Sequence, residues 1–255
     1  MINDNQFLRN EMLLGDNITS DLSKTTVMII GLGGVGSYTV ETLARLGVGH
    51  FVLIDKDKVE ISNINRQIIA TFETIGEDKV EIAKKRILSI NPKATVDVEK
   101  IFLTEATLNI LSSYNVDYIV DAIDTITSKV SLIEYCLRNN IPVISCTGMA
   151  NKIDPTLVRI TTLDKTSVDP ICRKLRELCK KRDLDFRKIN VVYSIEIPRS
   201  QNIQVKENGT MKEKFPPSSI VIPPAIAGIL MTYHILKEIM KKEHKEDGSN
   251  NKEQI

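Results

Sequence analysis

Two hydrophobic patterns alternate along the first 146 residues of the chain. Short continuous apolar runs are typical of buried strands, and apolar positions that recur every three or four residues are typical of amphipathic helices. The predicted strands cover 27–30, 50–55, 95–102, 117–124 and 142–146, and the predicted helices cover 35–46, 77–90, 108–114 and 125 to about 139. This alternation predicts an α/β fold, with a largely parallel sheet that carries helices on both faces.

The pattern changes after Gly148. Two further strands are expected over 156–162 and 190–196, with a basic helical segment over 169–188 between them. A polar stretch over 199–218 predicts a long loop, a last helix is expected over 224–242, and the tail 243–255 is typical of disorder. We find neither an internal repeat nor a linker. We therefore predict one domain over residues 1–242, in which the later strands extend the sheet and a helix ends the fold.

Composition and charge fit an ordinary globular protein. The 255 residues carry a net charge of +1, which argues neither for nor against a nucleic-acid partner. The four cysteines form no C-x-x-C pair, so we expect no structural zinc and free thiols in a reducing cytoplasm. The N-terminus lacks the apolar core of a signal peptide, and prolines interrupt the longest apolar run, 220–230. We expect a cytoplasmic protein without a membrane span.

A glycine-rich loop, GLGGVGS, follows the first predicted strand and opens a helix. Its glycines would let the backbone approach a phosphate group, which the N–H groups at the start of the helix would bind. Asp55 comes at the end of the second strand, where a carboxylate can accept hydrogen bonds from ribose hydroxyls. We predict a Rossmann-like nucleotide-binding site. The alternative is a glycine turn that only packs the helix onto the sheet.

Three cations and an acid favour ATP over NAD as the nucleotide. Transfer to the α-phosphorus of ATP needs positive charge around the polyphosphate, and Arg66, Lys79 and Arg9 are the candidates to supply it. Asp124 is the last residue of the fourth predicted strand and faces the crevice where parallel sheets bind ligands, so it is a natural Mg²⁺ ligand. Each residue alone fits a solvated surface charge equally well. Their combination is what favours an ATP site.

The segments GLGGVGS, LIDKDKVEISNINRQ, GEDKVEIAKKRILSINP and VDAID resemble the ThiF/MoeB/HesA adenylating enzymes, relatives of the ubiquitin-activating enzymes. The resemblance is strong over residues 7–165, and its most specific part is the D-x-D-x-V-x-x-S-N-x-x-R-Q run. It implies that a carboxylate is activated with ATP and Mg²⁺, which gives an acyl-adenylate and pyrophosphate.

The same resemblance implies which residues form the site. The residues expected to bind the nucleotide are Gly31, Gly33, Gly34, Gly36, Asp55, Asp57, Asn63, Arg66, Gln67 and Lys79. Arg66, Lys79, Asp124 and Arg9 are expected to act in catalysis, with Asp124 on the metal ion. Arg9 matches an arginine that reaches the site of the other subunit, so the resemblance implies a homodimer.

Residues 153–180, IDPTLVRITTLDKTSVDPICRKLRELCK, resemble the branch of this family that acts on threonylcarbamoyladenosine beside the tRNA anticodon. This branch implies an ATP-dependent dehydratase. It would adenylate the threonyl carboxylate and close it to the cyclic form with release of AMP. Because the ring-closing attack is intramolecular, the reaction needs no nucleophile from the enzyme.

Two features bear on the substrate. Residues 172–188 hold eight Lys and Arg against three acids, which fits either the phosphates of tRNA or a solvated helix face. Cys172 and Cys179 are expected to be half-buried structural thiols, and Lys180 and Lys181 are expected to lower the pKa of Cys179 somewhat. The resemblance implies a tRNA that carries threonylcarbamoyladenosine as the partner, and a sulfur-relay or cysteine-desulfurase protein is the second candidate.

Two other functions stay open. One is an activating enzyme that adenylates the C-terminal glycine of a ubiquitin-like sulfur-carrier protein, although such enzymes typically hold zinc with two C-x-x-C pairs. The other is an NAD(P)-dependent oxidoreductase or nucleotide-sensing module, in which Arg66 and Lys79 would have no role at the nucleotide.

Overall fold

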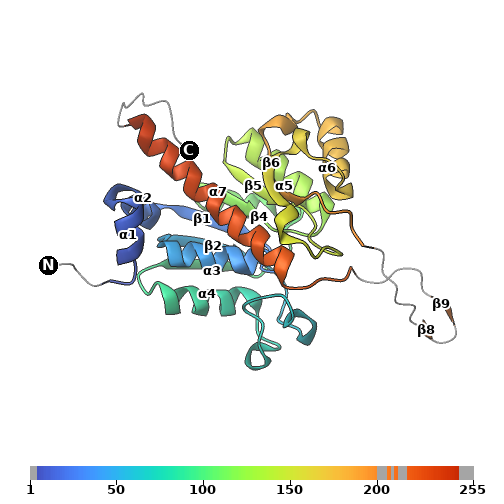
Figure 1. Ribbon diagram of the computed structural model, residues 1–255, viewed down its shortest axis with the longest axis horizontal. Helices are drawn as coiled ribbons and strands as arrows, with labels where there is room; N and C mark the ends of the chain where they lie inside the picture. The colour runs from blue at the N-terminus through green and yellow to red at the C-terminus, as the bar shows by residue number, and fades with distance from the viewer. Residues whose placement is uncertain (1–4, 200–205, 208–209, 212–216, 247–255) are drawn as a thin grey trace.

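The computed structural model describes residues 5–199, 206–207, 210–211 and 217–246 (Figure 1). A seven-stranded sheet runs through its centre in the order β3-β2-β1-β4-β5-β7-β6. The strands are β1 (Thr26–Ile30), β2 (His50–Ile54), β3 (Thr95–Glu99), β4 (Tyr118–Asp121), β5 (Val143–Cys146), β6 (Val158–Thr162) and β7 (Asn190–Ser194). All neighbours pair in parallel except β6 and β7. The prediction of a largely parallel sheet, extended by later strands, is confirmed.

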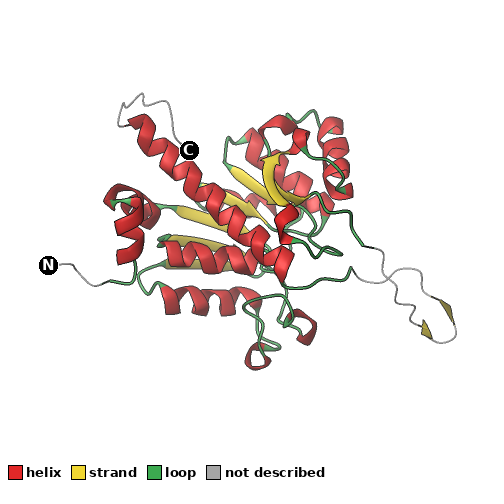
Figure 2. Ribbon diagram, in the orientation of Figure 1, coloured by secondary structure: helices red, strands yellow, loops and turns green. Residues whose placement is uncertain are grey.

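Helices cover both faces of this sheet (Figure 2). The α-helices are α1 (Leu8–Leu14), α2 (Asp16–Lys24), α3 (Gly36–Leu46), α4 (Lys79–Ile90), α5 (Ile126–Arg138), α6 (Pro170–Lys181) and α7 (Ile222–Glu246). Short 3-10 helices are η1 (Ile61–Asn63), η2 (Phe72–Thr74), η3 (Glu105–Ser113), η4 (Pro155–Leu157), η5 (Leu163–Lys165) and η6 (Phe186–Lys188). No helix among the described residues is both long and apolar enough to cross a membrane.

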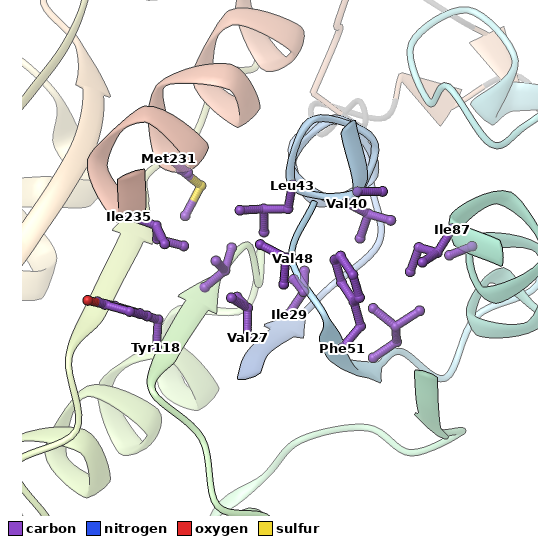
Figure 3. Packing of buried hydrophobic residues seen from close by; sticks show 14 of the residues in the cluster. Val27, Ile29, Val40, Leu43, Val48, Phe51, Ile87, Tyr118, Met231 and Ile235 are labelled. Carbon is purple, nitrogen blue, oxygen red and sulfur yellow. The ribbon is translucent and has the colours of Figure 1, made fainter. Parts of the chain in front are cut away.

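Side chains alternate between the two faces of the sheet along each strand, so each strand contributes to the core on both faces. In β1, Val27 and Ile29 belong to the core under α3, α4 and α7, which Figure 3 shows from close by. Met28 and Ile30 belong to the core under η3 and α5 on the other face. Because successive side chains of a strand point to opposite faces, one fully apolar strand supplies both cores. This is why the central strands read as continuous apolar runs.

Several predicted boundaries differ from the structure. The fourth strand ends at Asp121 and not at 124, so Asp124 lies in the loop before α5. The helix expected over 169–188 ends at Lys181, because Asp183 has the left-handed backbone (φ 54°) that closes a helix. The C-terminal helix continues to Glu246, four residues into the segment expected to be disordered. The rest of that segment, 247–255, lies outside the described residues.

The stretch 199–218, predicted to be a long loop, is described only in part. It contains the two-stranded pair β8 (Lys206–Glu207) and β9 (Thr210–Met211), and residues 200–205, 208–209 and 212–216 lie outside the described residues. Asn151 holds both ends of this stretch. Its backbone carbonyl accepts the N–H of Arg199 at 2.8 Å, and its side-chain oxygen accepts the N–H of Ser218 at 3.0 Å.

Candidate nucleotide-binding site

The glycine loop leaves the sheet where β1 lies between β2 and β4, at the edge formed by the C-terminal ends of the parallel strands. We call this the carboxyl edge and the opposite one the amino edge. Two of its glycines are required by close approach of the backbone. A Cβ on Gly31, whose φ is 90°, would lie 2.7 Å from the carbonyl oxygen of Ala122, and a Cβ on Gly36 would lie 1.8 Å from that of Gly31. No larger residue fits either position.

Of the other two glycines, Gly33 leaves space at the carboxyl edge and Gly34 packs closely against α7. Around a Cβ placed on Gly33, the nearest atom is Nε2 of Gln67 at 3.9 Å. A Cβ on Gly34 would lie 3.2 Å from Pro224 at the start of α7. Gly33 therefore forms the floor of an open cradle in front of the N-terminus of α3. Backbone N–H groups at such a position bind phosphate oxygens.

Asp55 holds this loop in place. Its Oδ2 accepts the N–H of Leu32 at 2.6 Å, and its Oδ1 accepts the N–H of Asp57 at 2.8 Å. Each carboxylate oxygen can accept a second hydrogen bond, which leaves capacity for the hydroxyls of a ribose. The predicted ribose-binding acid thus lies directly beside the glycine loop, and it also links that loop to the segment after β2.

The segment after β2 folds back over the glycine loop. Asn63 is buried, and its Oδ1 accepts the N–H of Glu60 at 3.1 Å, so it shapes the turn. Arg66 is half-buried and donates from Nη1 to the carbonyl of Ser62 at 2.7 Å. Gln67 is 5% exposed, and its Oε1 has no hydrogen-bond partner. A buried acceptor left unpaired next to the open cradle is suited to a bound ligand that donates a hydrogen bond.

Lys79 supplies a buried cation to the same place. It is the first residue of α4, its side chain is 7% exposed, and its Nζ lies 3.4 Å from Oδ2 of Asp57. The backbone N–H of Lys79 also donates to the carbonyl of Asp57 at 3.0 Å. Lys79 is therefore held at the helix N-terminus by Asp57. Together with the backbone N–H groups around Gly33 and the guanidinium of Arg66, it makes a donor-rich site that fits a polyphosphate.

Asp124 lies across the crevice on the loop that follows β4. Its side chain is exposed, and Oδ1 accepts the hydroxyl of Thr125 at 3.2 Å. An exposed carboxylate at the strand switch point can join a hydrated Mg²⁺ ion that also contacts a phosphate. Among the described residues, no group of three or more His, Cys, Asp or Glu side chains could hold a metal ion.

Arg9 does not join this group. It is exposed on α1, which lies at the amino edge, where the ring of Phe7 would meet a Cβ on Gly47 at 3.6 Å. Gly47 ends α3, whereas the glycine loop begins it, so the 11 residues of α3 separate Arg9 from the loop. At 1.5 Å per residue this is about 16 Å. Arg9 therefore cannot reach the nucleotide site of its own chain.

A buried network that was not predicted from the sequence adjoins the site. Asp121, at the end of β4, accepts hydrogen bonds on Oδ2 from Lys129 Nζ at 2.8 Å and from Ser145 Oγ at 2.7 Å. Its Oδ1 accepts the N–H of Ile123 at 3.2 Å, which fixes the turn toward Asp124. An acid inside the apolar run YIVD was the signal that could have revealed it, because a buried carboxylate needs partners.

Helix α7 also supports the glycine loop, which sequence reasoning did not foresee. A Cβ on Gly228 would lie 2.5 Å from the carbonyl oxygen of Val35, so only glycine allows this close approach. The hydroxyl of Thr39 donates to the carbonyl of Gly228 at 3.2 Å. The isolated glycine within the apolar run AIAGILM was the available signal.

The four cysteines are buried and free, so the prediction of free thiols is confirmed and that of half-buried ones is wrong. Burial raises the pKa of Cys172 and of Cys179 to about 11 and that of Cys146 to about 12. The expectation that lysines lower the pKa of Cys179 is also wrong. Lys180 and Lys181 are exposed, whereas the thiol is enclosed by the core between α5 and α6.

Comparisons with known proteins show which family this chain belongs to. The profile of the ThiF family matches residues 7–253. The tRNA threonylcarbamoyladenosine dehydratase of Bacillus subtilis is 41% identical over 242 residues, which cover 92% of this chain and 95% of the relative. The Escherichia coli enzyme of the same name is 40% identical over 168 residues, 66% of this chain and 63% of the relative.

The fold agrees as well. The crystal structure of the E. coli dehydratase TcdA in complex with ATP superimposes with a TM-score of 0.85 at 32% identity, and the match covers 96% of this chain and 99% of that one. The family match therefore spans almost the whole chain and includes the glycine loop, the segment after β2 and the later strands. This chain belongs to the ThiF family.

Proposed function

We propose that this chain is an ATP-dependent tRNA threonylcarbamoyladenosine dehydratase. It adenylates the threonyl carboxylate of the modified nucleoside and closes it to the cyclic form with release of AMP. The observation that carries this proposal is the 41% identity to the B. subtilis dehydratase over 92% of the chain. A match of that length includes both the nucleotide-binding half and the half after Gly148.

ATP is the nucleotide that we assign to the glycine loop. The related E. coli structures hold ATP and AMP. In this chain the cradle above Gly33 is open, and Lys79 is buried at the N-terminus of α4 next to Asp57. The unpaired Oε1 of Gln67 is an acceptor, which fits a hydroxyl or amino group of the nucleotide and not its phosphates. Asp55 would bind the ribose, while Asn63 and Arg66 would shape and charge the wall of the phosphate site.

The reaction proceeds in two displacements. A carboxylate oxygen of the threonyl group attacks the α-phosphorus of ATP, and the bond to pyrophosphate breaks. The carbamoyl group of the same nucleoside then attacks the acyl carbon, and AMP leaves with the former carboxylate oxygen. The nucleoside thereby loses the elements of one water. Arg66 and Lys79 would stabilise the negative charge that develops on the phosphates.

Asp124 would hold a Mg²⁺ ion against the phosphates. Its exposed carboxylate beside the cradle fits this ion, since Mg²⁺ prefers oxygen ligands and usually retains several waters. The ion, when bound, would supply positive charge at the leaving pyrophosphate. Asp124 would be the one carboxylate that positions the ion. The buried pair of Asp121 and Lys129 would orient it, because Asp121 binds the N–H of Ile123 in the turn that leads to Asp124.

A homodimer would complete the site with Arg9 from the second subunit. Arg9 is too far from its own glycine loop, yet it is exposed on a helix that also exposes Met12 (76%) and Leu13 (83%). Large apolar side chains that adjoin one another on a surface are typical of a protein contact. A second copy that covers α1 would bury them and bring Arg9 to the nucleotide.

The predicted sulfur-relay or cysteine-desulfurase partner stays a prediction, as does the cytoplasmic location. All four thiols are buried, so a relay onto any of them would require local opening of the fold.

The test is AMP release from ATP and Mg²⁺ by the purified protein in three parallel reactions. One contains tRNA that carries threonylcarbamoyladenosine, one the same tRNA without the modification, and one a ubiquitin-like sulfur carrier. We expect release only with the modified tRNA, together with the loss of one water from the nucleoside mass. Release only with the carrier protein would overturn the proposal in favour of carrier activation.

A further inference from the structure

We propose that the exposed face of α6 and η6 binds the phosphate backbone of the tRNA substrate, chiefly through Arg173, Lys180 and Lys188. This inference rests on the proposed function for the identity of its ligand. Residues 172–188 contain eight Lys and Arg against three acids, whereas the whole chain has a net charge of only +1. The remainder of the chain is therefore net negative, and positive charge is concentrated on this one segment.

Two of the eight cations, Arg176 and Arg182, bind other parts of the protein and are therefore not available to bind RNA. The Nη1 of Arg176 donates to the carbonyls of Leu163 and Thr166 at 3.2 and 3.0 Å, which joins α6 to the segment after β6. Arg182 binds the carboxylate of Glu134 on α5 at 2.7 Å. Both side chains are partly buried, so they help to hold α6 on the sheet.

Three more cations on this surface share two acids. Glu177 pairs with Lys174 at 3.0 Å and with Lys181 at 3.1 Å, and Asp185 pairs with Arg187 at 2.8 Å. Such exposed pairs are weak and are easily exchanged for a phosphate, but they lower the local positive potential.

Arg173, Lys180 and Lys188 are the cations that remain. All three are exposed, and none forms an ion pair with any residue that the structure describes. Lys180 lies over the ring of Phe186 at 5.8 Å, which keeps its charge on the surface near η6. Unpaired exposed cations are the groups that gain most from a phosphate, because counterion release is not opposed by the loss of an existing pair.

The position of α6 relative to the crevice fits a long substrate. A buried ion pair between Lys152 and Asp169 (2.6 Å) fastens the first turn of α6 to the loop after β5, at the carboxyl edge. Asp169 also accepts the N–H of Ile171 at 2.9 Å as the N-cap of the helix. In Figure 1, α6 lies on the outer side of α5, at the same end of the sheet as β5 and β6.

Arg173 is consequently about one turn of α6 from the carboxyl edge, and Lys180 lies seven residues further along the helix, about 10 Å away. Lys188 follows after the turn, in η6. Arg173 and Lys180 thus lie on one face of α6, which runs from the carboxyl edge toward the amino edge. Lys188 lies at the amino edge, where it lines a hollow together with Arg182 and Asp183. A nucleoside in the crevice and the flanking backbone on this face would be bound together.

The exposed face of α6 is not an apolar docking surface, because the apolar side chains of this helix are buried on its opposite face. Cys172, Leu175 and Cys179 are fully buried against α5 and β7, and the exposed positions of the helix after Pro170 are charged. A membrane or an apolar groove of a protein would need apolar side chains among the cations. RNA needs only the positive charge.

The experiment measures binding of tRNA that carries threonylcarbamoyladenosine, as a function of salt, to the full chain and to the triple variant R173Q/K180Q/K188Q. We expect the Kd to rise about tenfold or more and the slope of log K against log salt to become shallower by about 2. The KM for ATP should be unchanged, and turnover at saturating tRNA should be retained.

The matched control is K85Q/K93Q/K237Q, which removes the same charge from three exposed lysines that lie outside α6 and form no ion pair among the described residues. An equal loss of affinity in both triple variants would overturn the α6 assignment, since bulk charge would then explain it. If the proposed function is wrong, the result is a different one: the wild-type protein would bind tRNA but release no AMP. The Kd values of the two triple variants would still decide whether α6 binds the tRNA.

Discussion

The Nζ of Lys129 lies 2.8 Å from Oδ2 of Asp121, and the side chains of this ion pair are 2% and 0% exposed. The pair joins α5 to the end of β4, directly below the turn that carries Asp124. Buried ion pairs gain little net stability, because removing two charges from water costs about as much as their attraction returns. Its position at the crevice suggests that its contribution is to orient this turn.

The first prediction concerns this pair. Lys129→Met leaves the Asp121 carboxylate buried without its cation, which should lower the free energy of unfolding by about 3–5 kcal/mol. Replacing both partners, as in D121N/K129M, should restore most of that stability because no charge then stays unpaired. Urea unfolding of the three proteins measures this. Equal stability of the single variant and the unmodified chain would show that the pair is not charged or not buried.

A second prediction separates two glycines of the same loop. Gly33→Ala should fold normally, because its Cβ meets no atom closer than 3.9 Å, but the methyl group enters the cradle and should weaken ATP binding at least tenfold. Gly36→Ala should fail to fold stably, since its Cβ would lie 1.8 Å from a backbone oxygen. Thermal unfolding with and without ATP checks both, and a stable Gly36→Ala protein would contradict the packing described here.

The third prediction is that Lys79→Ala abolishes AMP release while the protein stays folded. Lys79 is buried at the N-terminus of α4, so the variant loses buried methylene groups as well as a weak ion pair with the half-exposed Asp57, and stability should fall by about 2–3 kcal/mol. Turnover and circular dichroism of the purified variant provide the measurement. Lys85→Ala, on the exposed face of the same helix, is the control. Normal turnover of Lys79→Ala would remove it from the site.

For Asp124, we expect the Ala substitution to abolish Mg²⁺-dependent turnover with little effect on stability, since the side chain is exposed. ATP binding without Mg²⁺ should be retained. Titration of activity against Mg²⁺ for the variant and for Asp117→Asn, which removes an acid before the start of β4, distinguishes a metal ligand from a general loss of negative charge. An unaltered Mg²⁺ titration curve would exclude the metal role.

The buried thiols give a prediction on pH. Their folded pKa values, about 11 for Cys172 and Cys179, exceed the ordinary 9.0, so the protonated form is favoured in the native state. The contribution of these protonated thiols to the free energy of unfolding is fully present below pH 9. It is lost as the pH rises from 9 toward 11, because the thiols ionise in the unfolded chain before they ionise in the native protein. Urea unfolding from pH 8 to 11 should show this decline, with a shallower slope for C172A/C179A. Rapid alkylation of Cys179 in the native protein at pH 8 would contradict it.

The sequence by itself determined the order of the elements and the chemistry of the nucleotide loop. Apolar runs revealed the parallel strands because strands buried on both faces carry few polar residues. The glycine loop and Asp55 were predictable for a local reason: a tight turn between a strand and a helix, with an acid at the end of the next strand, lies within one βαβ unit. Geometry over so short a range can be predicted from the spacing of residues along the chain.

Only the tertiary structure decided which segments that are distant in the sequence contact one another. Helix α7 reaches the glycine loop through Gly228, some 190 residues away in sequence, and Lys129 neutralises Asp121 beneath Asp124. The same is true of Cys179, whose pKa is set by the enclosing core and not by the lysines that follow it. Spacing predicts which face of an element a residue occupies, whereas burial and pairing depend on the elements that pack against that face.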